Sequence, residues 1–291
     1  MREREFRDEL IERINSAATQ HGAFSRQELL RFDIGRPEPF AVIDYSRGIR
    51  NPQSLSATLS VVSSPDGPYQ DMPQENGLME YHYRAGGVDG DNRKLRVAYE
   101  DRLPIILFLK PEANYYVPIA PVYVVGDDPE RRVYTLALNE VAEVQFDGGQ
   151  PSSLPRSYVE RVVRQRLHQP MFRGMVLRAY RVQCAVCRFR HGELLDAAHI
   201  IADAHAEGHA IVTNGMALCK MHHAAYDGNF LGISGDYRVH INRDLLEEVD
   251  GPMLKHGLQE MHGSTIVLPE RRNLRPKRES LDQRFEDFLR R

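Results

Sequence analysis

Apolar and polar positions repeat with different periods along the chain, and each change of period marks a change in predicted structure. The first 18 residues repeat their apolar positions at helical spacing, which predicts an amphipathic helix over residues 2–18. Those positions are Phe6, Leu10, Ile11 and Ile14. Ser25 is a suitable N-cap for a second, short helix that ends at Leu30. Both helices are expected to frame the domain that follows.

From Phe40 onward, short runs rich in β-branched and aromatic residues are separated by turn sequences such as SPDGP and GGVDGDN. The predicted strands are Phe40–Asp44, Ala57–Ser63, Leu78–Arg84, Pro104–Leu109, Tyr115–Val125 and Val133–Leu138. Asn92–Asp101 is predicted to be a single helix among them. Many strands with tight turns and few helices indicate a small twisted barrel or a curled sheet.

The second half of the chain has a mixed character. Asp147–Pro155 has the composition of a linker, and residues 156–182 predict two helical segments interrupted near Pro170. The C-terminal region ends in an amphipathic stripe formed by Leu281, Phe285, Phe288 and Leu289, which is expected to dock on the core or on a partner subunit. The predicted fold class is therefore α+β, with a β-rich domain at 1–150, a basic helical linker at 151–182 and a second domain at 183–291.

A hairpin followed by a helix is predicted within the second domain. Glu193–Ile201 is apolar and short enough for a strand, with His199 near its end. His205–Thr213 reads as a polar turn and a second short apolar run, with Asn214 at its exit. Ala217–Tyr226 lacks Gly and Pro and is rich in helix formers, so it is predicted to be helical.

Composition is that of a soluble globular protein. The chain has 291 residues, 42% hydrophobic and 27% charged, which is enough for two domains with real cores. No apolar run approaches membrane-spanning length, and the N-terminus mixes acidic and basic residues, unlike a secretory signal. All three cysteines lie between 184 and 219, where they fit a metal site, so we expect no disulfide and a cytoplasmic location.

The net charge of −3 does not by itself indicate a nucleic-acid-binding protein, but its distribution does. Residues 1–150 carry 17 Lys and Arg against 24 Asp and Glu, whereas residues 151–291 carry 21 against 17. Nine arginines and a single acid fall between residues 156 and 190. Four of these arginines are predicted phosphate contacts: Arg161, Arg164, Arg188 and Arg190. The alternative is a solvated helix face, although such faces usually mix both signs.

A zinc site is predicted from two short ligand pairs. Cys184 and Cys187 form a C-x-x-C pair, and Cys219 and His222 form a C-x-x-H pair after 31 intervening residues. Three thiolates and one imidazole fit the closed tetrahedral coordination of structural Zn²⁺. A pair of exposed thiols is the simpler alternative for Cys184 and Cys187.

Three polar residues beside the zinc ligands are not needed to close that site: His199, Asn214 and His223. On a helix, His223 and Asp227 share one face at positions i and i+4. An imidazole and a carboxylate can hold a divalent ion such as Mg²⁺ or Mn²⁺ and leave positions open for a phosphate oxygen. His199 opposite that pair would be suited to deprotonate an attacking water. A buried structural histidine is the alternative for His199, and a polar helix end is the alternative for Asp227.

Within the frame of the two zinc-ligand pairs, His199, Asn214 and His223 resemble the HNH, or ββα-metal, nuclease motif. The resemblance implies that His199 is the general base and that Asn214 holds the hairpin loop. It also implies that His223 is a ligand of the catalytic ion, with Asp227 as the second ligand. Many members carry Asp or His immediately before the general base, but this chain has Ala198 there. Asp196, two residues earlier on the same strand face, is a candidate replacement.

A base-binding pocket is predicted in the first domain, where Tyr69 and Asp71 precede Tyr81 and Tyr83 on a strand. Two aromatic faces and one carboxylate are what a pocket for an extruded nucleobase requires. This segment is similar to the SRA domain, a branch of the PUA-like barrels that flips 5-methylcytosine out of DNA. The similarity implies that Tyr69 and Tyr81 or Tyr83 sandwich the base and that Asp71 reads its polar edge. The alternative for the tyrosines is ordinary sheet packing.

The order of an SRA-like barrel, a basic helical linker and an HNH domain resembles modification-dependent restriction endonucleases. The resemblance implies a nuclease that cuts double-stranded DNA carrying 5-methylcytosine or 5-hydroxymethylcytosine. Because one HNH site usually nicks one strand, a homodimer is expected for double-strand cutting. Two alternatives remain: an HNH endonuclease whose first domain reads an unmodified sequence, and a zinc-stabilised DNA-binding protein without nuclease activity.

Overall fold

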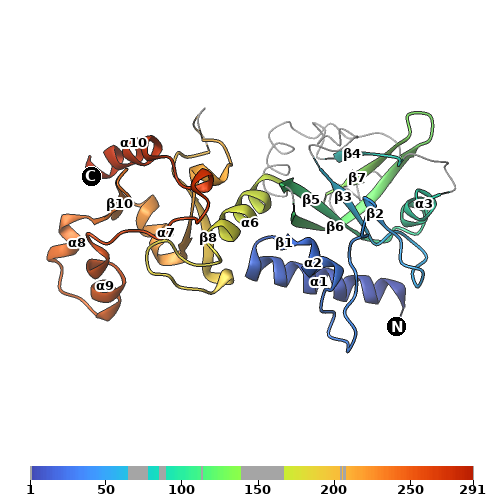
Figure 1. Cartoon of the computed structure of the whole chain (residues 1–291), viewed down its shortest axis with the longest axis horizontal. Helices are drawn as coiled ribbons and strands as arrows, with labels where there is room; N and C mark the ends of the chain where they lie inside the picture. The colour runs from blue at the N-terminus through green and yellow to red at the C-terminus, as the bar shows by residue number, and fades with distance from the viewer. Residues whose placement is uncertain are drawn as a thin grey trace. The chain divides into compact units, whose positions relative to one another are not determined.

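The computed structural model describes residues 2–64, 78–84, 90–112, 114–138, 167–203, 205 and 208–290. The chain separates into two compact units (Figure 1). Unit 1 comprises Met1–Ala18 and Ala23–Met171, and unit 2 comprises Thr19–Gly22 and Phe172–Arg291. Within the described residues, no helix combines the length and the apolar character that crossing a membrane requires.

Unit 1 is built around a mixed seven-stranded sheet. Its described elements are α1 (Glu3–His21), β1 (Phe24–Ser25), α2 (Arg26–Leu30), β2 (Ile49–Arg50), β3 (Ser60–Ser63), β4 (Leu78–His82), α3 (Arg93–Glu100), β5 (Ile105–Glu112), β6 (Tyr115–Asp128) and β7 (Val133–Ala137). The strand order is β2-β3-β5-β6-β7-β4, with β1 paired to β6. Only β3 and β5 run parallel. The predicted α+β fold with a curled sheet is confirmed.

The curl arises in β6, which pairs with two strands in succession. Its first part pairs with β5, and its second part, from Tyr123 onward, pairs with β7. The register shifts between Val124 and Gly126, and such irregularities bend a strand and increase its twist. β6 therefore belongs to both halves of the sheet, and the bend in β6 changes the direction of the sheet between them.

β5 is buried on both faces, because helices cover it from opposite sides. Ile105 and Leu107 lie in a core that also holds α3. Ile106 and Phe108 lie in a second core that also holds α1. Successive residues of a strand face opposite sides of the sheet. Because both sides of β5 are covered, its buried residues are apolar on both faces, which explains its continuous apolar run. Figure 1 shows α1 and α3 against different parts of the sheet.

One charged residue is part of the interior of unit 1. Arg7 in α1 is fully buried and donates to the carbonyl oxygens of Ala57, Thr58 and Pro104 at 2.8–2.9 Å. It also pairs with Glu3 at 2.7 Å. Burial lowers the pKa of Arg7, and the Glu3 carboxylate opposes that shift. Every polar atom of the guanidinium thus has a partner that fastens α1 to the loops before β3 and β5.

The predicted strand Phe40–Asp44 is wrong. Phe40 forms only an isolated bridge with Phe32, and no described strand covers this segment. Val42 and Ile43 are nevertheless buried, so the apolar run reflects core packing of a loop rather than a hydrogen-bonded ladder. The other five predicted strands overlap β3 to β7.

Unit 2 contains two small antiparallel hairpins and several helices. Its elements are α6 (Gln169–Ala179), η2 (Gly192–Leu194), β8 (Leu195–His199), η3 (Val212–Asn214), β9 (Gly215–Cys219), α7 (Lys220–Asp227), β10 (Leu231–Ile233), β11 (Val239–Ile241), α8 (Arg243–Glu247), α9 (Pro252–Gly257), η4 (Gln259–Met261), η5 (Arg272–Leu274) and α10 (Arg278–Leu289). β8 pairs with β9, and β10 pairs with β11. Pro170 falls in the first turn of α6, where a missing N–H is tolerated.

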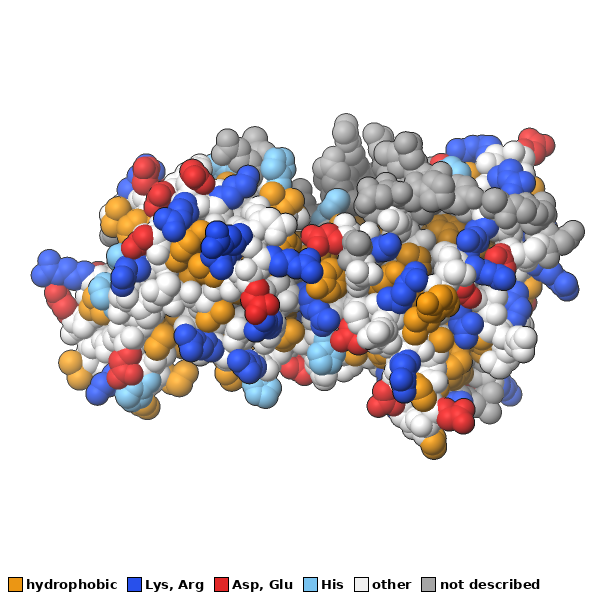
Figure 2. Space-filling model, in the orientation of Figure 1, with side chains coloured by type: hydrophobic (Ala, Val, Ile, Leu, Met, Phe, Trp, Pro, Cys, Tyr) orange, Lys and Arg blue, Asp and Glu red, His pale blue; other side chains and the backbone are white. Residues whose placement is uncertain are grey.

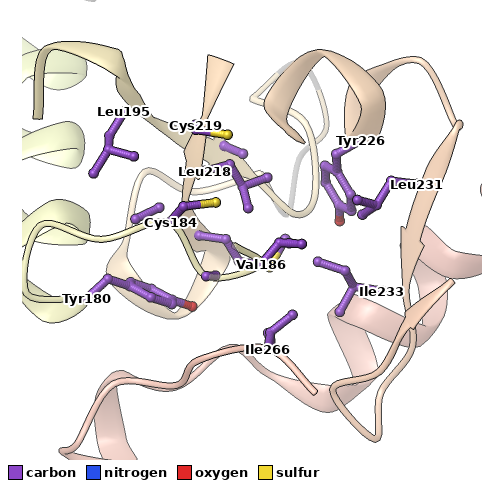
Figure 3. Packing of buried hydrophobic residues seen from close by; sticks show 14 of the residues in the cluster. Tyr180, Cys184, Val186, Leu195, Leu218, Cys219, Tyr226, Leu231, Ile233 and Ile266 are labelled. Atoms are coloured by element: carbon purple, nitrogen blue, oxygen red, sulfur yellow. The ribbon is translucent and has the colours of Figure 1, made fainter. Parts of the chain in front are cut away.

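A single hydrophobic cluster joins these elements, and Figure 3 shows Leu195, Leu218, Tyr226 and Ile233 among its members. α10 contributes Leu281 to it. The stripe predicted to dock therefore does so in part: Leu281 and Phe288 are buried, whereas Leu289 is 67% exposed.

The predicted second strand and helix need a shift in boundary. Ala217 to Cys219 belong to β9 rather than to the helix, and Asn214 precedes this strand instead of following one. All five residues of β9 are buried, and a short, fully apolar run has no period that separates strand from helix.

Candidate functional site

Four residues of unit 2 converge on one point. The ligand atoms of Cys184, Cys187, Cys219 and His222 all lie within 4.8 Å of one another. The Cys187 and Cys219 sulfurs are 3.9 Å apart, and the Cys184 Sγ is 3.5 Å from Nδ1 of His222. A tetrahedral site with Zn–S bonds of about 2.3 Å would place two sulfurs roughly 3.8 Å apart. The donor set and its spacing therefore fit a zinc ion, as the sequence predicts.

The immediate surroundings of the cluster suit metal binding. Hydrogen bonds from Cys187 and Cys219 lower the pKa of the Cys184 thiol, which favours the thiolate that binds a metal. His222 presents Nδ1 to the sulfurs, while its Nε2 lies 2.8 Å from the carbonyl oxygen of Gly257. A proton on Nε2 donated to that carbonyl leaves the Nδ1 lone pair for a metal, which is the usual arrangement of a ligating histidine.

The hairpin of β8 and β9 carries the next two candidate residues. His199 is the last residue of β8 and lies opposite Gly215 in the register. Asn214 is buried in the adjoining turn. Its Oδ1 accepts from the Ile201 N–H at 2.9 Å, and its Nδ2 donates to the carbonyl oxygens of Ile201 and His209 at 3.0 Å. The Asn214 side chain thus ties together both ends of the hairpin loop directly after His199.

His199 is held against α6. Its imidazole stacks on Phe172 at a ring-centroid distance of 4.0 Å and an angle of 20°. Gly215, across the hairpin, allows this approach, because an added Cβ would lie 2.6 Å from Val176 and 2.7 Å from Phe172. The Nε2 atom of His199 is buried and has no hydrogen-bond partner among the described residues. Burial lowers the pKa of His199, and the nearby Asp203 carboxylate only partly offsets this. This shift favours the neutral form of the ring.

α7 places His223 between two carboxylates. Nδ1 of His223 is 3.2 Å from Asp196, and Nε2 is 3.3 Å from Asp227. Burial raises the pKa of Asp196, but hydrogen bonds from Lys220 and His223 outweigh it and lower that pKa. Asp196 is thus an ionised acceptor for a proton on Nδ1. Nε2 then faces the Asp227 carboxylate with its lone pair, an arrangement that a cation between the two atoms would stabilise.

This geometry changes the interpretation of Asp196. The carboxylate contacts Nδ1 of His223 and Nζ of Lys220, at 2.5 Å, rather than the Nε2 and Asp227 side. We therefore interpret Asp196 as the residue that orients His223, not as a replacement ligand for the position of Ala198. Ala198 is itself fully buried in the core, so a ligand side chain there would need a different strand orientation.

His199, His223 and Asp227 line one cleft of about 640 Å³. The other lining residues are Ile200, Ile201, Ala202, Asp203, His205, Gln283, Arg284, Glu286, Asp287 and Arg290. The last five belong to α10 or follow it directly. The sequence predicts that α10 docks through its apolar stripe, but it gives no sign that the polar face of this helix forms a wall of the cleft.

Arg284 is the most firmly held of these residues. Its guanidinium donates to Asn229 Oδ1 at 2.5 Å and to the carbonyl oxygen of Tyr226 at 2.7 Å, and it lies over the Tyr226 ring. Tyr226 is in α7, so Arg284 joins the C-terminal helix to the helix that carries His223. A basic residue on the polar face of a docked amphipathic helix is the only sequence signal for it.

The predicted base pocket falls only partly within the described residues. Tyr69 and Asp71 lie outside them. Tyr81 and Tyr83 are buried, at 4% and 2% exposure. The Tyr83 ring stacks on Tyr134 at 4.5 Å, and its hydroxyl bonds to Asp127. Both tyrosines are thus part of the core of unit 1, and Tyr81 also lines a cleft.

The predicted phosphate contacts divide in the same way. Arg161 and Arg164 lie outside the described residues. Arg188 and Arg190 are exposed on the loop between Cys187 and η2. On the face of the molecule in Figure 2, basic side chains occur on both units with acidic side chains among them.

The Cys and His cluster and the residues His199, Asn214, His223 and Asp227 lie in one segment of the chain. Residues 184–234, which contain the Cys and His cluster, the hairpin and α7, match the family model described as HNH endonuclease. The matched segment agrees with the arrangement of His199, Asn214 and His223 around the cluster, so this part of the chain is similar to HNH endonucleases. None of the curated proteins compared with the chain matches it.

Three solved structures are similar to the chain at low identity. A modification-dependent TagI restriction endonuclease is 13% identical with a TM-score of 0.30, over 90% of this chain and 89% of that one. The SRA domain of SUVH5 in complex with hemi-methylated CG DNA is 18% identical with a TM-score of 0.27, over 45% and 88%. The type IV phosphorothioation-dependent restriction endonuclease ScoMcrA is 15% identical with a TM-score of 0.22, over 79% and 55%. The chain thus spans about half the length of the last.

Proposed function

We propose that the protein hydrolyses phosphodiester bonds in double-stranded DNA that carries modified cytosine, with a divalent metal ion as cofactor. The observation that carries the hydrolytic part is one cleft that contains a neutral histidine, His199, and a histidine–carboxylate pair, His223 and Asp227. Asp196 contacts His223 directly, and Asn214 holds the loop that follows His199.

His223 and Asp227 would hold Mg²⁺ or Mn²⁺. Nε2 of His223 and the facing Asp227 oxygen are 3.3 Å apart, close to the roughly 3 Å that separates adjacent ligands at metal–ligand distances near 2.1 Å. Asp227 is 64% exposed, so substrate and water can reach this side of the pair. When bound, the ion would polarise the scissile phosphate and stabilise negative charge on the leaving oxygen.

His199 is proposed as the general base that accepts a proton from the attacking water. A base must be unprotonated at the working pH, and burial keeps the pKa of His199 low enough for that. Stacking on Phe172 and the hydrogen bonds of Asn214 restrict where the ring can point. These contacts would orient the base before substrate binds. Such pre-orientation of the reacting groups supplies much of the rate enhancement at active sites.

The cluster of three cysteines and His222 is proposed to bind structural Zn²⁺. All four protein ligands close the tetrahedron and leave no position for substrate. Its role is to hold the start of α7 and the adjoining end of the hairpin, since Cys219 ends β9 and His222 lies in α7.

Unit 1 is proposed to be an SRA-like reader of 5-methylcytosine or 5-hydroxymethylcytosine. The support is the resemblance of the segment from Tyr69 to Tyr83 to base-flipping domains, together with the curled sheet that contains β4. In this proposal Tyr69 and Asp71 contact the base, and the basic segment 151–182 connects the reader to the nuclease. An unmodified recognition sequence is the alternative for the same unit.

A homodimer in the cytoplasm is proposed as the working form on DNA, because one HNH site cuts one strand and restriction requires both. Two copies bound to one duplex would supply two clefts. The mass of the protein–DNA complex tests this: one chain per duplex during double-strand cutting would contradict it.

The central experiment compares methylated and unmodified plasmid of the same sequence in Mg²⁺ or Mn²⁺. Cleavage restricted to methylated plasmid is expected, and equal cutting of both would remove the proposed reader function. His199→Ala is expected to abolish cleavage of either substrate. Cleavage by that variant at the wild-type rate would overturn the assignment of the base.

A further inference from the structure

Unit 1 contains a cleft of about 250 Å³ whose charged lining residues are mainly cations. Arg26, Arg47, Arg84 and Lys110 line it, together with one carboxylate, Asp44. They come from separate parts of the chain: the start of α2, the loop before β2, the end of β4 and the middle of β5. The fold, rather than one basic run, therefore collects these charges at one place.

The single carboxylate does not neutralise them. One Asp44 oxygen accepts from the backbone N–H groups of Ser46 and Arg47, at 3.0 and 2.9 Å, and so holds the loop. Burial raises the pKa of Asp44, but these hydrogen bonds and the nearby arginines outweigh it and lower that pKa. Arg47 pairs with a residue outside the cleft lining, Asp91, at 2.8 Å.

Arg26 is fixed by neutral groups. It donates to the carbonyl oxygen of Tyr45 at 2.7 Å and to the hydroxyl of Tyr116 at 3.3 Å. Its charge therefore has no carboxylate partner among the described residues, although its position is set. A positioned cation without a counter-charge is typical of a site that receives an anion.

The positive charges of Arg84 and Lys110 have even fewer partners than that of Arg26. Nη1 of Arg84 is buried and has no hydrogen-bond partner in the described part of the chain. Lys110 is half-buried on β5 and forms no ion pair within the same part. A buried guanidinium nitrogen without an acceptor costs free energy, and an oxyanion in the cleft would supply that acceptor.

The aromatic residues of the cleft offer hydroxyl groups rather than ring faces. Tyr81 and Tyr116 are 4% and 2% exposed. The Tyr81 hydroxyl donates to the carbonyl oxygen of Gly48 at 3.2 Å, and the Tyr116 hydroxyl accepts from Arg26. No ring in the described lining is open for a base to stack on, so the chemistry of this cleft suits a phosphate and not a nucleobase.

We propose that this cleft binds a backbone phosphate of the DNA substrate, with Arg84 and Lys110 as its direct contacts and Arg26 as the cation behind them. The inference rests on the proposed function, because it assumes that unit 1 binds DNA. Phosphate contacts set the register of a protein on a duplex without reading its sequence. The cleft would therefore fix where unit 1 sits, and base contacts elsewhere would select the modified site.

The experiment measures binding of a fluorescent methylated duplex to full-length protein as a function of salt concentration. The variants are Arg84→Gln and Lys110→Gln, with Arg84→Lys and Lys110→Arg to restore the charge. Arg4→Gln is the matched control, because this substitution also removes one positive charge. Arg4 is exposed on α1 and lies outside the cleft lining. Thermal unfolding of each variant checks that it folds.

Each Gln variant is expected to lower the slope of log K against log salt by about 0.9, which is roughly eightfold in affinity at about 0.1 M salt. The charge-restoring variants should recover most of the slope, and Arg4→Gln should leave it unchanged. Unchanged slopes in both Gln variants, or an equal loss in Arg4→Gln, would overturn the proposal.

A second arm separates DNA from a free phosphate compound by titrating inorganic phosphate and deoxycytidine monophosphate calorimetrically. Tight binding of either one that depends on Arg84, combined with unchanged DNA slopes, would assign the cleft to a small metabolite and refute the DNA assignment. The cleavage assay is independent of both arms. Loss of slope in a protein that does not cut would support the phosphate cleft while the proposed nuclease function fails.

Discussion

Asn214→Ala tests how the hairpin loop positions the proposed base. The substitution removes an acceptor for the Ile201 N–H and two donors to the carbonyl oxygens of Ile201 and His209. These bonds close the loop two residues after His199. Without them, the segment that follows His199 is free to move away from η3, and the imidazole loses its fixed direction.

The stability cost follows from the same three contacts. At a net value of about 1 kcal/mol for each hydrogen bond, the substitution should destabilise the protein by roughly 3 kcal/mol. Ile201 is buried, at 6% exposure, so water cannot readily replace the lost acceptor. The loss of cleavage rate is limited by the contribution of the base itself. It should approach the roughly 10²–10⁴-fold in rate that a positioned general base contributes.

The assays are urea unfolding, with zinc present, and nicking of supercoiled methylated plasmid below the unfolding temperature. Asn242→Ala is the matched control, since Asn242 is a half-buried N-cap in the same unit and its side chain accepts from the Asp244 N–H. It should cost about 1 kcal/mol and leave the rate unchanged. Asn214→Asp should not rescue Asn214→Ala, because it keeps the acceptor but places an oxygen against two carbonyl groups.

A double-mutant cycle decides the mechanism. If Asn214 acts through His199, adding Asn214→Ala to His199→Ala should reduce the rate little further. Two results would refute this reasoning. One is a folded Asn214→Ala protein with the wild-type rate, and the other is a full additional loss in the His199→Ala background.

Three further predictions concern the same unit. First, kcat/KM should rise with pH through an apparent pKa below the value of about 6.5 usual for histidine, because burial depresses the pKa of His199; an ascending limb centred above 7 would contradict this. By linkage, the neutral buried ring also contributes stability that is present above pH 6.5 and lost as the pH falls below it, since the unfolded state then binds more protons. Second, the purified protein should hold one zinc ion per chain by elemental analysis, and Cys187→Ala should hold none and unfold at lower urea; wild-type zinc content in this variant would exclude Cys187 as a ligand. Third, Asp196→Asn should weaken activation by Mg²⁺ about 10–100-fold with little change in zinc content, because the residue orients His223; an unchanged metal dependence would show that it does not.

The zinc cluster shows what spacing alone can predict. Cys184 and Cys187 lie in one tight turn, and Cys219 and His222 lie at a strand–helix junction, so local geometry brings each pair together. The only long-range requirement is that the two pairs meet, and the structure places all four ligand atoms within 4.8 Å. His223 and Asp227 follow the same logic, since helical spacing puts them on one face.

Features that depend on burial could not be predicted in this way. Arg7 reads as a surface charge on an amphipathic helix, yet it lies in the core because three carbonyl oxygens from distant loops converge on it. Tyr83 is two residues from Tyr81 and is predicted to face a base, but it stacks on Tyr134 in the interior. The polar face of α10 forms a wall of the cleft that holds His199 and His223. In each case the deciding partner is remote in sequence, and periodicity contains no information about it.

The hairpin and α7 explain why a metal cluster and a catalytic pair occur on the same short segment. β8 and β9 have five residues each, and an isolated two-stranded hairpin of that size is at best marginally stable in water. At one end of the hairpin, Leu195 faces Cys219 in the zinc cluster; at the other end, His199 faces Gly215. Successive helix residues point about 100° apart, so His222 can face the cluster while His223 faces Asp227. Any rotation of α7 that displaced one imidazole would displace the other. Holding Cys219 and His222 therefore fixes the end of the strand and the orientation of the helix together, and with them the relation of His199 to His223 across the cleft.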